Sequence, residues 1–229
     1  MLSVGLVVAM PEEAAHVYNS LGEFVCSKEE HGFKVDTYSC GDKNIHIIGS
    51  GIGEINATLA TQFLIINYNV NYVINFGVVG TFNPLFKSLD VVAVDEIVHY
   101  DFSLDTMDKD SFGKYPFQRD KAEFKTDRRM LDLLHKIDED IPFVKIATGD
   151  KFVANMELRD WIVDTFHADI CDMESMGIYY ACMRYGVPCL FIKAVSDNAD
   201  SEAQVSFEKV VENGVAAYVS LVERILKEL

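Results

Sequence analysis

The 229-residue sequence is poor in basic residues: Lys and Arg total 20 against 36 Asp and Glu, which gives a formal net charge of −16. Such a charge repels phosphate backbones and anionic lipid headgroups, so we expect neither a nucleic-acid partner nor a membrane partner. No apolar run approaches the roughly 18 residues that a transmembrane helix needs. The apolar opening, residues 1–10, lacks a basic flank and runs directly into Pro11, which is typical of a buried strand and not of a secretory signal.

The sequence also has little that favours disulfide, metal or covalent chemistry. Its five cysteines are odd in number and include no C-x-x-C pair, so we expect reduced thiols in a cytoplasmic protein. The six histidines show no metal-ligand spacing with another His, a Cys or a carboxylate, and no metal site is expected. There is no G-x-S-x-G elbow, and no cysteine has an obvious histidine partner, so an activated covalent nucleophile has no local support.

Apolar residues make up 49% of the chain and charged residues 24%, which is enough hydrophobic material for a sizeable core. Short apolar runs alternate with stretches of helical periodicity, and this pattern predicts an α/β fold with a mostly parallel sheet covered by helices. The length fits one domain spanning residues 1–229, with no internal repeat, low-complexity tract or linker.

Local patterns predict the strands and helices of that fold. Strands are expected over residues 3–9, 33–40, 44–49, 72–76, 89–98, 143–148, 168–171 and 189–195, with a hairpin turn at Gly41 and Asp42. Helices are expected from Pro11, over 55–67, after Asn155, over 174–185 and over 202–226. Residues 101–126 are polar, and we interpret them as a long loop or lid.

Two glycine-rich segments follow predicted strands and bear on ligand binding. Residues 49–53 begin like a dinucleotide-binding fingerprint, but Glu54 stands where the third glycine belongs, and its charge would oppose a pyrophosphate. We therefore expect no nicotinamide or flavin cofactor; the loop lets backbone lie close to a small ligand or makes a tight turn. Residues 76–80 mark a second strand end, and open α/β sheets bind ligands beyond such ends.

Acidic residues follow three of the predicted strands. Asp197 and Asp200 come after the last predicted strand, Glu13 comes after the first, and Glu174 begins a helix shortly after another. Because the carboxyl ends of parallel strands meet at one edge of a sheet, these acids could converge on one crevice. The alternative is that each of them caps a helix or is simply solvated.

Five segments, in order along nearly the whole chain, resemble the successive signatures of the nucleoside phosphorylase superfamily. They are AMPEE at 9–13, SGIG at 50–53, TGDKF at 148–152, DME at 172–174 and VSDNAD at 195–200. Within that superfamily the chain is similar above all to the hydrolytic branch, the 5′-methylthioadenosine/S-adenosylhomocysteine nucleosidases. Five collinear segments are far more specific than any one of them.

This resemblance implies a three-layer αβα fold with a mixed, mostly parallel central sheet flanked by helices. It implies hydrolysis of the N-glycosidic bond of 5′-methylthioadenosine and S-adenosylhomocysteine to adenine and a thioribose. It further implies a purine nucleoside as the small-molecule partner, no metal or organic cofactor, a homodimer, and a place in methionine salvage.

The resemblance also implies roles for the acidic residues. Asp197 resembles the general acid that protonates the five-membered ring of adenine as the base departs, and Glu13 resembles the general base that takes a proton from water. Glu174 resembles the residue that accepts hydrogen bonds from the ribose hydroxyls. Glycosidic cleavage passes through an oxocarbenium-like state, and two separated carboxyl groups suit that chemistry.

Further substrate contacts are implied around the adenine, the ribose and the 5′ substituent. They are Phe152 and Val153 at adenine, Met173 at the ribose, Met10, Ile52 and Phe207 around the 5′ substituent, and Val78, Lys193 and Ser196 in the same site.

Two of these positions depart from the family pattern. Val78 stands where family members often carry a hydroxyl group, and Lys193 stands where the nucleosidases commonly carry arginine near the ribose and the attacking water. No arginine precedes Arg119, and guanidinium groups are the usual phosphate ligands, so we favour water over phosphate as the nucleophile. Two alternatives stay open: a phosphate-dependent purine nucleoside phosphorylase of the same fold, and a nucleoside-binding protein with little turnover.

Overall fold

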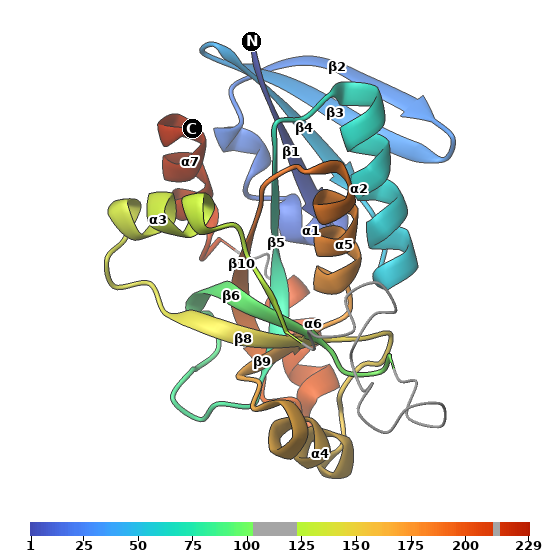
Figure 1. Cartoon of the computed structure of the whole chain (residues 1–229), viewed down its shortest axis with the longest axis vertical. Coiled ribbons are helices and arrows are strands. Elements are labelled where there is room, and N and C mark those ends of the chain that lie inside the picture. The colour runs from blue at the N-terminus through green and yellow to red at the C-terminus, as the bar shows by residue number, and fades with distance from the viewer. Residues whose placement is uncertain (103–122, 213–215) are drawn as a thin grey trace.

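The computed structural model describes residues 1–102, 123–212 and 216–229. Most of the polar segment 101–126, which we interpret as a loop or lid, therefore lies outside the described residues. Figure 1 shows the arrangement of the rest: a central sheet runs through the molecule, and helices lie on both of its sides.

The described residues form one ten-stranded mixed sheet and seven α-helices. The strands are β1 (Leu2–Val8), β2 (Glu23–Glu30), β3 (Phe33–Cys40), β4 (Lys43–Gly49), β5 (Tyr72–Thr81), β6 (Val91–His99), β7 (Glu123–Lys125), β8 (Phe143–Thr148), β9 (Ile170–Asp172) and β10 (Cys189–Asp197). The helices are α1 (Pro11–Ala14), α2 (Glu54–Tyr68), α3 (Arg128–Ile137), α4 (Met156–Phe166), α5 (Ser175–Tyr185), α6 (Ala203–Glu212) and α7 (Val219–Glu228), with a 3₁₀ turn at Tyr18–Ser20.

The strand pairings close part of the sheet into a ring. β1 pairs in parallel with β4 and β5, and β5 pairs in parallel with β10. β10 runs antiparallel to β6, β8 is parallel to both β6 and β9, and β9 returns antiparallel to β5. At the far edge β2, β3 and β4 form an antiparallel meander, which contains the predicted hairpin. The mixed sheet predicted from the sequence is confirmed.

Two hydrophobic cores lie on opposite faces of this sheet. One core packs α2 and α5 against the sheet, with Met176 fully buried, and the other packs α3 and α7 against it, with Ile225 fully buried. Along β1, Val7 belongs to the first core and Leu6 to the second, as expected for a strand whose side chains alternate between faces. The three-layer αβα arrangement is therefore confirmed (Figure 1).

The single C-terminal helix predicted over 202–226 is wrong, because the structure has two helices, α6 and α7, in this region. Val222 and Ile225 of α7 pack into a sheet core, whereas Phe207 of α6 lines a pocket. Val210 of α6 is packed against the same core as α7, so the two helices cover one face of the sheet although they are separate elements.

Candidate active site

A pocket of about 300 Å³ opens where the last residues of β5, β9 and β10 meet the segment that follows β1. This volume is at the lower end of the range for small-molecule sites. The pocket is lined by Ala9, Met10, Glu13, Ile52, Val78, Val79, Gly80, Lys151, Phe152, Val153, Cys171, Asp172, Met173, Glu174, Ser196, Asp197 and Phe207. Every predicted site residue except Lys193 is among them, so the fold brings together segments from residue 10 to residue 207.

Glu13 is held at the N-terminus of α1. Pro11 is the first residue of this short helix, where its missing N–H costs nothing. Two positions later Glu13 folds back, and its Oε2 accepts the Met10 N–H at 2.9 Å, while its Oε1 accepts the Val78 N–H of β5 at 2.9 Å. Burial raises the pKa of Glu13, and the hydrogen bonds from Val78 and Met10 offset only part of that effect. The carboxyl group is therefore adjusted toward the range in which a general base works near neutral pH.

Asp197 is placed by an irregularity at the end of β10. The pairing of β10 with β5 shifts register there, so that Asp197 pairs with Gly80 and Ser196 is the extra residue. Such bulges redirect side chains and occur beside active sites. Oδ2 of Asp197 accepts the Ser196 hydroxyl at 2.7 Å, and Oδ1 accepts the Ala199 N–H at 2.8 Å. Burial raises the pKa of Asp197, which favours the protonated form that a general acid needs.

Two glycines of β5 make room for these carboxyl groups. A Cβ atom at Gly77 would lie 2.7 Å from Oε1 of Glu13, and one at Gly80 would lie 3.0 Å from Oδ1 of Asp197. The predicted strand over 72–76 is therefore too short: β5 continues through both glycines, which permit close approach instead of a turn. Since the two glycines are three residues apart, the two acids contact β5 at points separated by roughly 10 Å.

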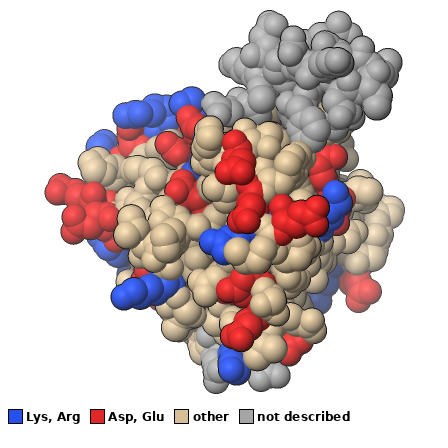
Figure 2. Space-filling model, turned by 90° about the horizontal axis from the view of Figure 1, so that it is seen from below, with Lys and Arg blue, Asp and Glu red and all other residues tan. Residues whose placement is uncertain are grey.

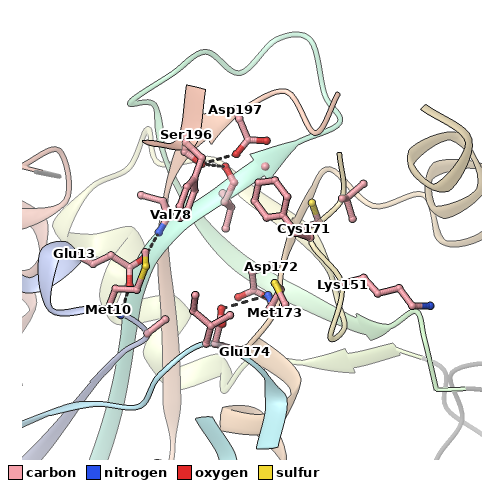
Figure 3. Close-up of a pocket in the computed structure, with 17 residues that line it drawn as sticks. Met10, Glu13, Val78, Lys151, Cys171, Asp172, Met173, Glu174, Ser196 and Asp197 are labelled. Atoms are coloured by element: carbon pink, nitrogen blue, oxygen red, sulfur yellow. Dashed lines mark hydrogen bonds between the residues drawn. The ribbon is translucent and has the colours of Figure 1, made fainter. Parts of the chain in front are cut away.

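Glu174 lies at the N-cap of α5 and is 8% exposed. Its Oε1 accepts the Gly53 N–H at 2.9 Å, and its Oε2 accepts the Met173 N–H at 3.3 Å. Burial raises the pKa of Glu174 to about 7; the charge of Asp172 adds to this effect and the ammonium group of Lys193 opposes it. The glycine loop before α2 therefore holds a carboxyl group that titrates near neutral pH. Figure 3 shows Glu13, Asp197 and Glu174 at three different sides of the pocket.

Lys193, the remaining predicted residue, lies behind the lining of the pocket. Its side chain is buried, and its Nζ is 2.7 Å from Oδ2 of Asp172. The same carboxyl group accepts the Ser175 hydroxyl at 2.6 Å. Burial acts to raise the pKa of Asp172, but the Lys193 ammonium group and the hydrogen bonds from Ser175 and Thr148 together outweigh it and hold that pKa below its usual value. The contact of Lys193 with ribose or water stays a prediction. In the structure its charge lies next to Asp172, which lines the pocket.

Aromatic and aliphatic side chains form the rest of the wall. The rings of Phe152, from the segment after β8, and Phe207, from α6, meet edge to face with centroids 5.7 Å apart. Phe152 is 44% exposed and Ile52 is 50% exposed. Large apolar side chains that stay exposed at the rim of a pocket are typical of ligand contact.

Some lining residues were not predicted from the sequence: Ala9, Val79, Gly80, Lys151, Cys171 and Asp172. All of them lie within a few positions of predicted site residues. Asp172 carried a usable signal, because it is an acid directly after a predicted strand. Lys151 is an exposed residue, and Figure 3 shows its side chain extending away from the acidic groups.

Within the described ranges, no three His, Cys, Asp or Glu side chains are grouped so that they could hold a metal ion. None of the helices in these ranges combines the length and the apolar character that crossing a membrane demands.

Figure 2 shows acidic side chains scattered over the face of the molecule seen from below, in keeping with the net charge of −16.

Known proteins are similar to this chain over nearly its whole length. The family model described as "Phosphorylase superfamily" matches residues 3–227. The 5′-methylthioadenosine/S-adenosylhomocysteine nucleosidase of Oceanobacillus iheyensis is 28% identical over 233 residues and covers 100% of both chains. The aminodeoxyfutalosine nucleosidase of Helicobacter pylori is 29% identical over 234 residues, covering 99% of this chain and 98% of the relative. A solved mutant of the Helicobacter pylori nucleosidase with 5′-methylthioadenosine in its active site has a TM-score of 0.93 at 26% identity, covering 100% of both chains.

Proposed function

The chain belongs to the phosphorylase superfamily, and from that premise we propose that it hydrolyses the N-glycosidic bond of adenine 5′-thionucleosides to adenine and a thioribose. The observation that carries the proposal is the position of Glu13 and Asp197, two buried acids that contact one stretch of β5 at separate points within one pocket. The name of the Oceanobacillus iheyensis relative supports this substrate class, and the Helicobacter pylori relative is also named a nucleosidase.

The carboxyl groups suit the separate parts of that reaction. Asp197, whose pKa is raised by burial, keeps its proton to a higher pH than free aspartic acid and can donate it to the departing adenine. Glu13 in its ionised form takes a proton from the water that attacks the sugar. Glu174 places negative charge where the sugar becomes cationic, which stabilises the transition state more than the substrate.

The charges around the pocket favour water over phosphate as the nucleophile. Among the described residues that line it, Lys151 is the one basic residue, and its side chain extends away from the acids (Figure 3). The ammonium group of Lys193 is already paired with Asp172. A phosphate dianion would meet several carboxyl groups there without the arginine fork that usually binds it.

Release of adenine at the same rate with and without phosphate is the expected result. The purified protein is incubated with 5′-methylthioadenosine, S-adenosylhomocysteine and inosine in both buffers, and the sugar product is identified by mass spectrometry. We expect a free thioribose from the two thionucleosides. Base release that needs phosphate and yields a sugar 1-phosphate would establish the phosphorylase alternative. Tight binding without release, even at high enzyme concentration, would establish the binding-protein alternative.

The part of the pocket assigned to the 5′ substituent is apolar. Met10, Ile52 and Phe207 line it, and a methylthio group removes apolar surface from water when it packs against such side chains. The Helicobacter pylori relative is named for aminodeoxyfutalosine, so a futalosine-like nucleoside belongs in the same assay as a test of how large a 5′ substituent the pocket accepts.

The rate should fall in acid with the loss of two ionised groups. Glu13 and Glu174 both have raised pKa values, that of Glu174 at about 7, and the proposed mechanism needs both of them ionised. As pH drops below both pKa values, kcat/KM should therefore fall about a hundredfold per pH unit, which is a slope of about two in a plot of log(kcat/KM) against pH. The Glu174→Gln variant, although slower, should show a slope of about one. A slope that is unchanged in this variant would show that Glu174 does not titrate in the catalytic range.

We also propose that the protein is a homodimer formed through α2. Ile55, Leu59 and Ile66 of α2 recur at the spacing of one helix face and are 71%, 49% and 54% exposed, and Ile52, just before the helix, is 50% exposed. Ile52 also lines the pocket, so this stripe is continuous with the site, and a second copy seated on it would meet the pocket rim. Monomeric proteins seldom leave so many neighbouring large apolar side chains in water.

Leu59→Glu should convert the dimer to a monomer, because a carboxylate in an apolar contact between copies is costly to desolvate. Sedimentation velocity of the wild-type protein and the variant measures the change. Leu85→Glu, which alters an exposed leucine outside α2, is the matched control and should leave the mass unchanged. A wild-type protein that sediments as a monomer at all concentrations would contradict the proposed dimer.

The remaining proposals are that residues 1–229 form a single domain and that the protein acts in the cytoplasm in methionine salvage. The single sheet, which includes strands from residue 2 to residue 197, supports the first of these. The cysteines of the described residues are free, and three of them are buried, which supports a reducing compartment. Adenine thionucleosides as substrates would support the role in salvage.

A further inference from the structure

Glu54 is a buried acid that the proposed mechanism does not use. It is the first residue of α2, it is 7% exposed, and it lies next to the pocket without lining it. Burial raises the pKa of Glu54 well above its usual value; the charges of Asp172 and Glu174 raise it further, while hydrogen bonds from Thr148 and Gly177 act against them. Burying such a group is costly unless its hydrogen bonds are satisfied. Here its partners are Thr148, the last residue of β8, and Gly177, in the first turn of α5, and both elements adjoin segments that line the pocket.

Glu54 and Glu174 exchange hydrogen bonds across the N-termini of two helices. Oε2 of Glu54 accepts the N–H of Gly177 in the first turn of α5. In return, Oε1 of Glu174, at the N-cap of α5, accepts the N–H of Gly53, the N-cap residue of α2, at 2.9 Å. Each helix therefore supplies the carboxyl group that satisfies a free N–H at the start of the other.

The two helix N-termini are in close contact at this point. A Cβ atom on Gly177 would overlap the backbone oxygen of Glu54 and would lie 2.8 Å from its Oε2. The N–H of Glu54 is also held, because it donates to Oδ1 of Asp150 at 2.8 Å. The start of α2 is thus fixed to α5 on one side and to the segment that carries Phe152 on the other.

The second oxygen of Glu54 leads to the buried ion pair. Oε1 accepts the Thr148 hydroxyl at 2.5 Å, and the same hydroxyl also acts to lower the pKa of Asp172. A hydroxyl group has one proton to donate. In the structure Thr148 gives it to Glu54, so Glu54 accepts at both of its oxygens, from Thr148 and from Gly177. Thr148 thus links Glu54 to Asp172, which is paired with Lys193.

We propose that Glu54 is a positioning residue: its carboxyl group holds the N-termini of α2 and α5 together, so that Glu174 meets the ribose hydroxyls in a fixed place. This inference rests on the proposed function, in which Glu174 contacts the ribose. In this role Glu54 acts through its two hydrogen bonds, to Gly177 and to Thr148, and its negative charge is not needed. Glutamine can accept from Gly177 with its oxygen, and its NH₂ group can donate to the Thr148 hydroxyl once that hydroxyl rotates to accept. Glutamine should therefore replace Glu54, whereas alanine should not.

The test compares Glu54→Gln, Glu54→Ala, Glu174→Gln and the double variant Glu54→Ala/Glu174→Gln by steady-state kinetics with 5′-methylthioadenosine and its 2′-deoxy analogue. Glu54→Ala should lower kcat/KM on the order of 10- to 100-fold, the cost of misplacing a contact group, and Glu54→Gln should stay within about threefold of wild type. The loss in Glu54→Ala should shrink on the 2′-deoxy analogue. Because both residues act on one contact, the double variant should be little slower than Glu174→Gln alone. Glu157→Ala, which removes an exposed glutamate from the first turn of α4, is the matched control.

Several outcomes would overturn the inference: Glu54→Ala within twofold of wild type, losses that multiply in the double variant, or equal losses on both nucleosides. If Glu54→Ala does not fold by circular dichroism, Glu54→Asp takes its place, since its shorter side chain cannot span both contacts; activity equal to that of Glu54→Gln would then contradict the role. A wild-type protein that releases no base would refute the proposed function instead. In that case calorimetric binding of the two nucleosides to the same variants still measures whether Glu54 acts through Glu174.

Discussion

Replacing Asp197 by asparagine is expected to lower kcat by about 10²- to 10⁴-fold, the usual contribution of a general acid, while substrate affinity stays nearly unchanged. The amide of Asn can accept the Ala199 N–H and donate to the Ser196 hydroxyl, so both hydrogen bonds of the present carboxyl group can be kept. What is lost is the proton for the leaving adenine, an interaction made mainly in the transition state.

The measurement pairs turnover with binding. Adenine release gives kcat, and titration calorimetry of the slow variant with 5′-methylthioadenosine gives the affinity. Asp200→Asn is the matched control, because Asp200 is three residues further on and its carboxyl group contacts the Glu202 N–H outside the pocket lining. If affinity and rate fell together by the same factor in Asp197→Asn, the side chain would be a binding group and not the acid.

The candidate acids could be found from the sequence because they depend on local order. Asp197, Glu13 and Glu174 each follow a short apolar run, and the carboxyl ends of neighbouring strands must meet at one edge of a sheet. That reasoning needs only the sequence of elements and no knowledge of tertiary contacts. The same is true of the two sheet faces, which follow from the alternation of apolar residues along strands such as β1.

The length of β5 could not be found in this way. Glycines weaken strands, so a local interpretation ends the strand before Gly77. The structure shows why glycine is required at positions 77 and 80: the carboxyl groups of Glu13 and Asp197 occupy the space that side chains there would fill. Neither contact is visible in the local pattern, because one acid lies far before β5 in the sequence and the other far after it.

Glu54 and Lys193 show the same limit at buried charged positions. In the sequence, Glu54 serves only as an argument against pyrophosphate, whereas in the structure it reaches Gly177, 123 positions away. The resemblance assigns Lys193 to the substrate, a contact that stays a prediction, and in the structure its ammonium group is 2.7 Å from Asp172, behind the pocket lining. A lysine in an apolar strand gives no local sign of its partner, because pairing of buried charges is decided by tertiary packing.

β2 and α3 were not predicted, because their local apolar patterns are weak. The residues of β2 are almost all exposed, and the strand depends on its pairing with β3. Only Met130 and Leu134 of α3 are buried. Elements that bury so little apolar surface are stabilised by neighbours that the sequence does not identify.

Replacing Glu13 by glutamine is expected to lower kcat by about 10²- to 10⁴-fold, the usual contribution of a general base. Both oxygens of Glu13 accept backbone N–H groups, from Val78 and from Met10, and glutamine has only one oxygen to offer. Its NH₂ group would face one of these donors, so the variant loses a hydrogen bond as well as the base. We therefore expect the melting temperature to fall too, since an unsatisfied buried donor costs about 1–3 kcal/mol.

The two effects can be separated, because only loss of the base changes the pH dependence. The profile of kcat/KM should lose the ionisation of Glu13 in the variant, so that its slope in acid drops from about two to about one, with Glu174 as the remaining group. Glu12→Gln, at the neighbouring exposed position of α1, is the matched control and should leave rate, profile and melting temperature unchanged. The contrary result would be a Glu13→Gln variant with a lower melting temperature but with a rate within tenfold of wild type and an unchanged acid slope. Glu13 would then only hold α1 against β5, and another group would have to activate the water.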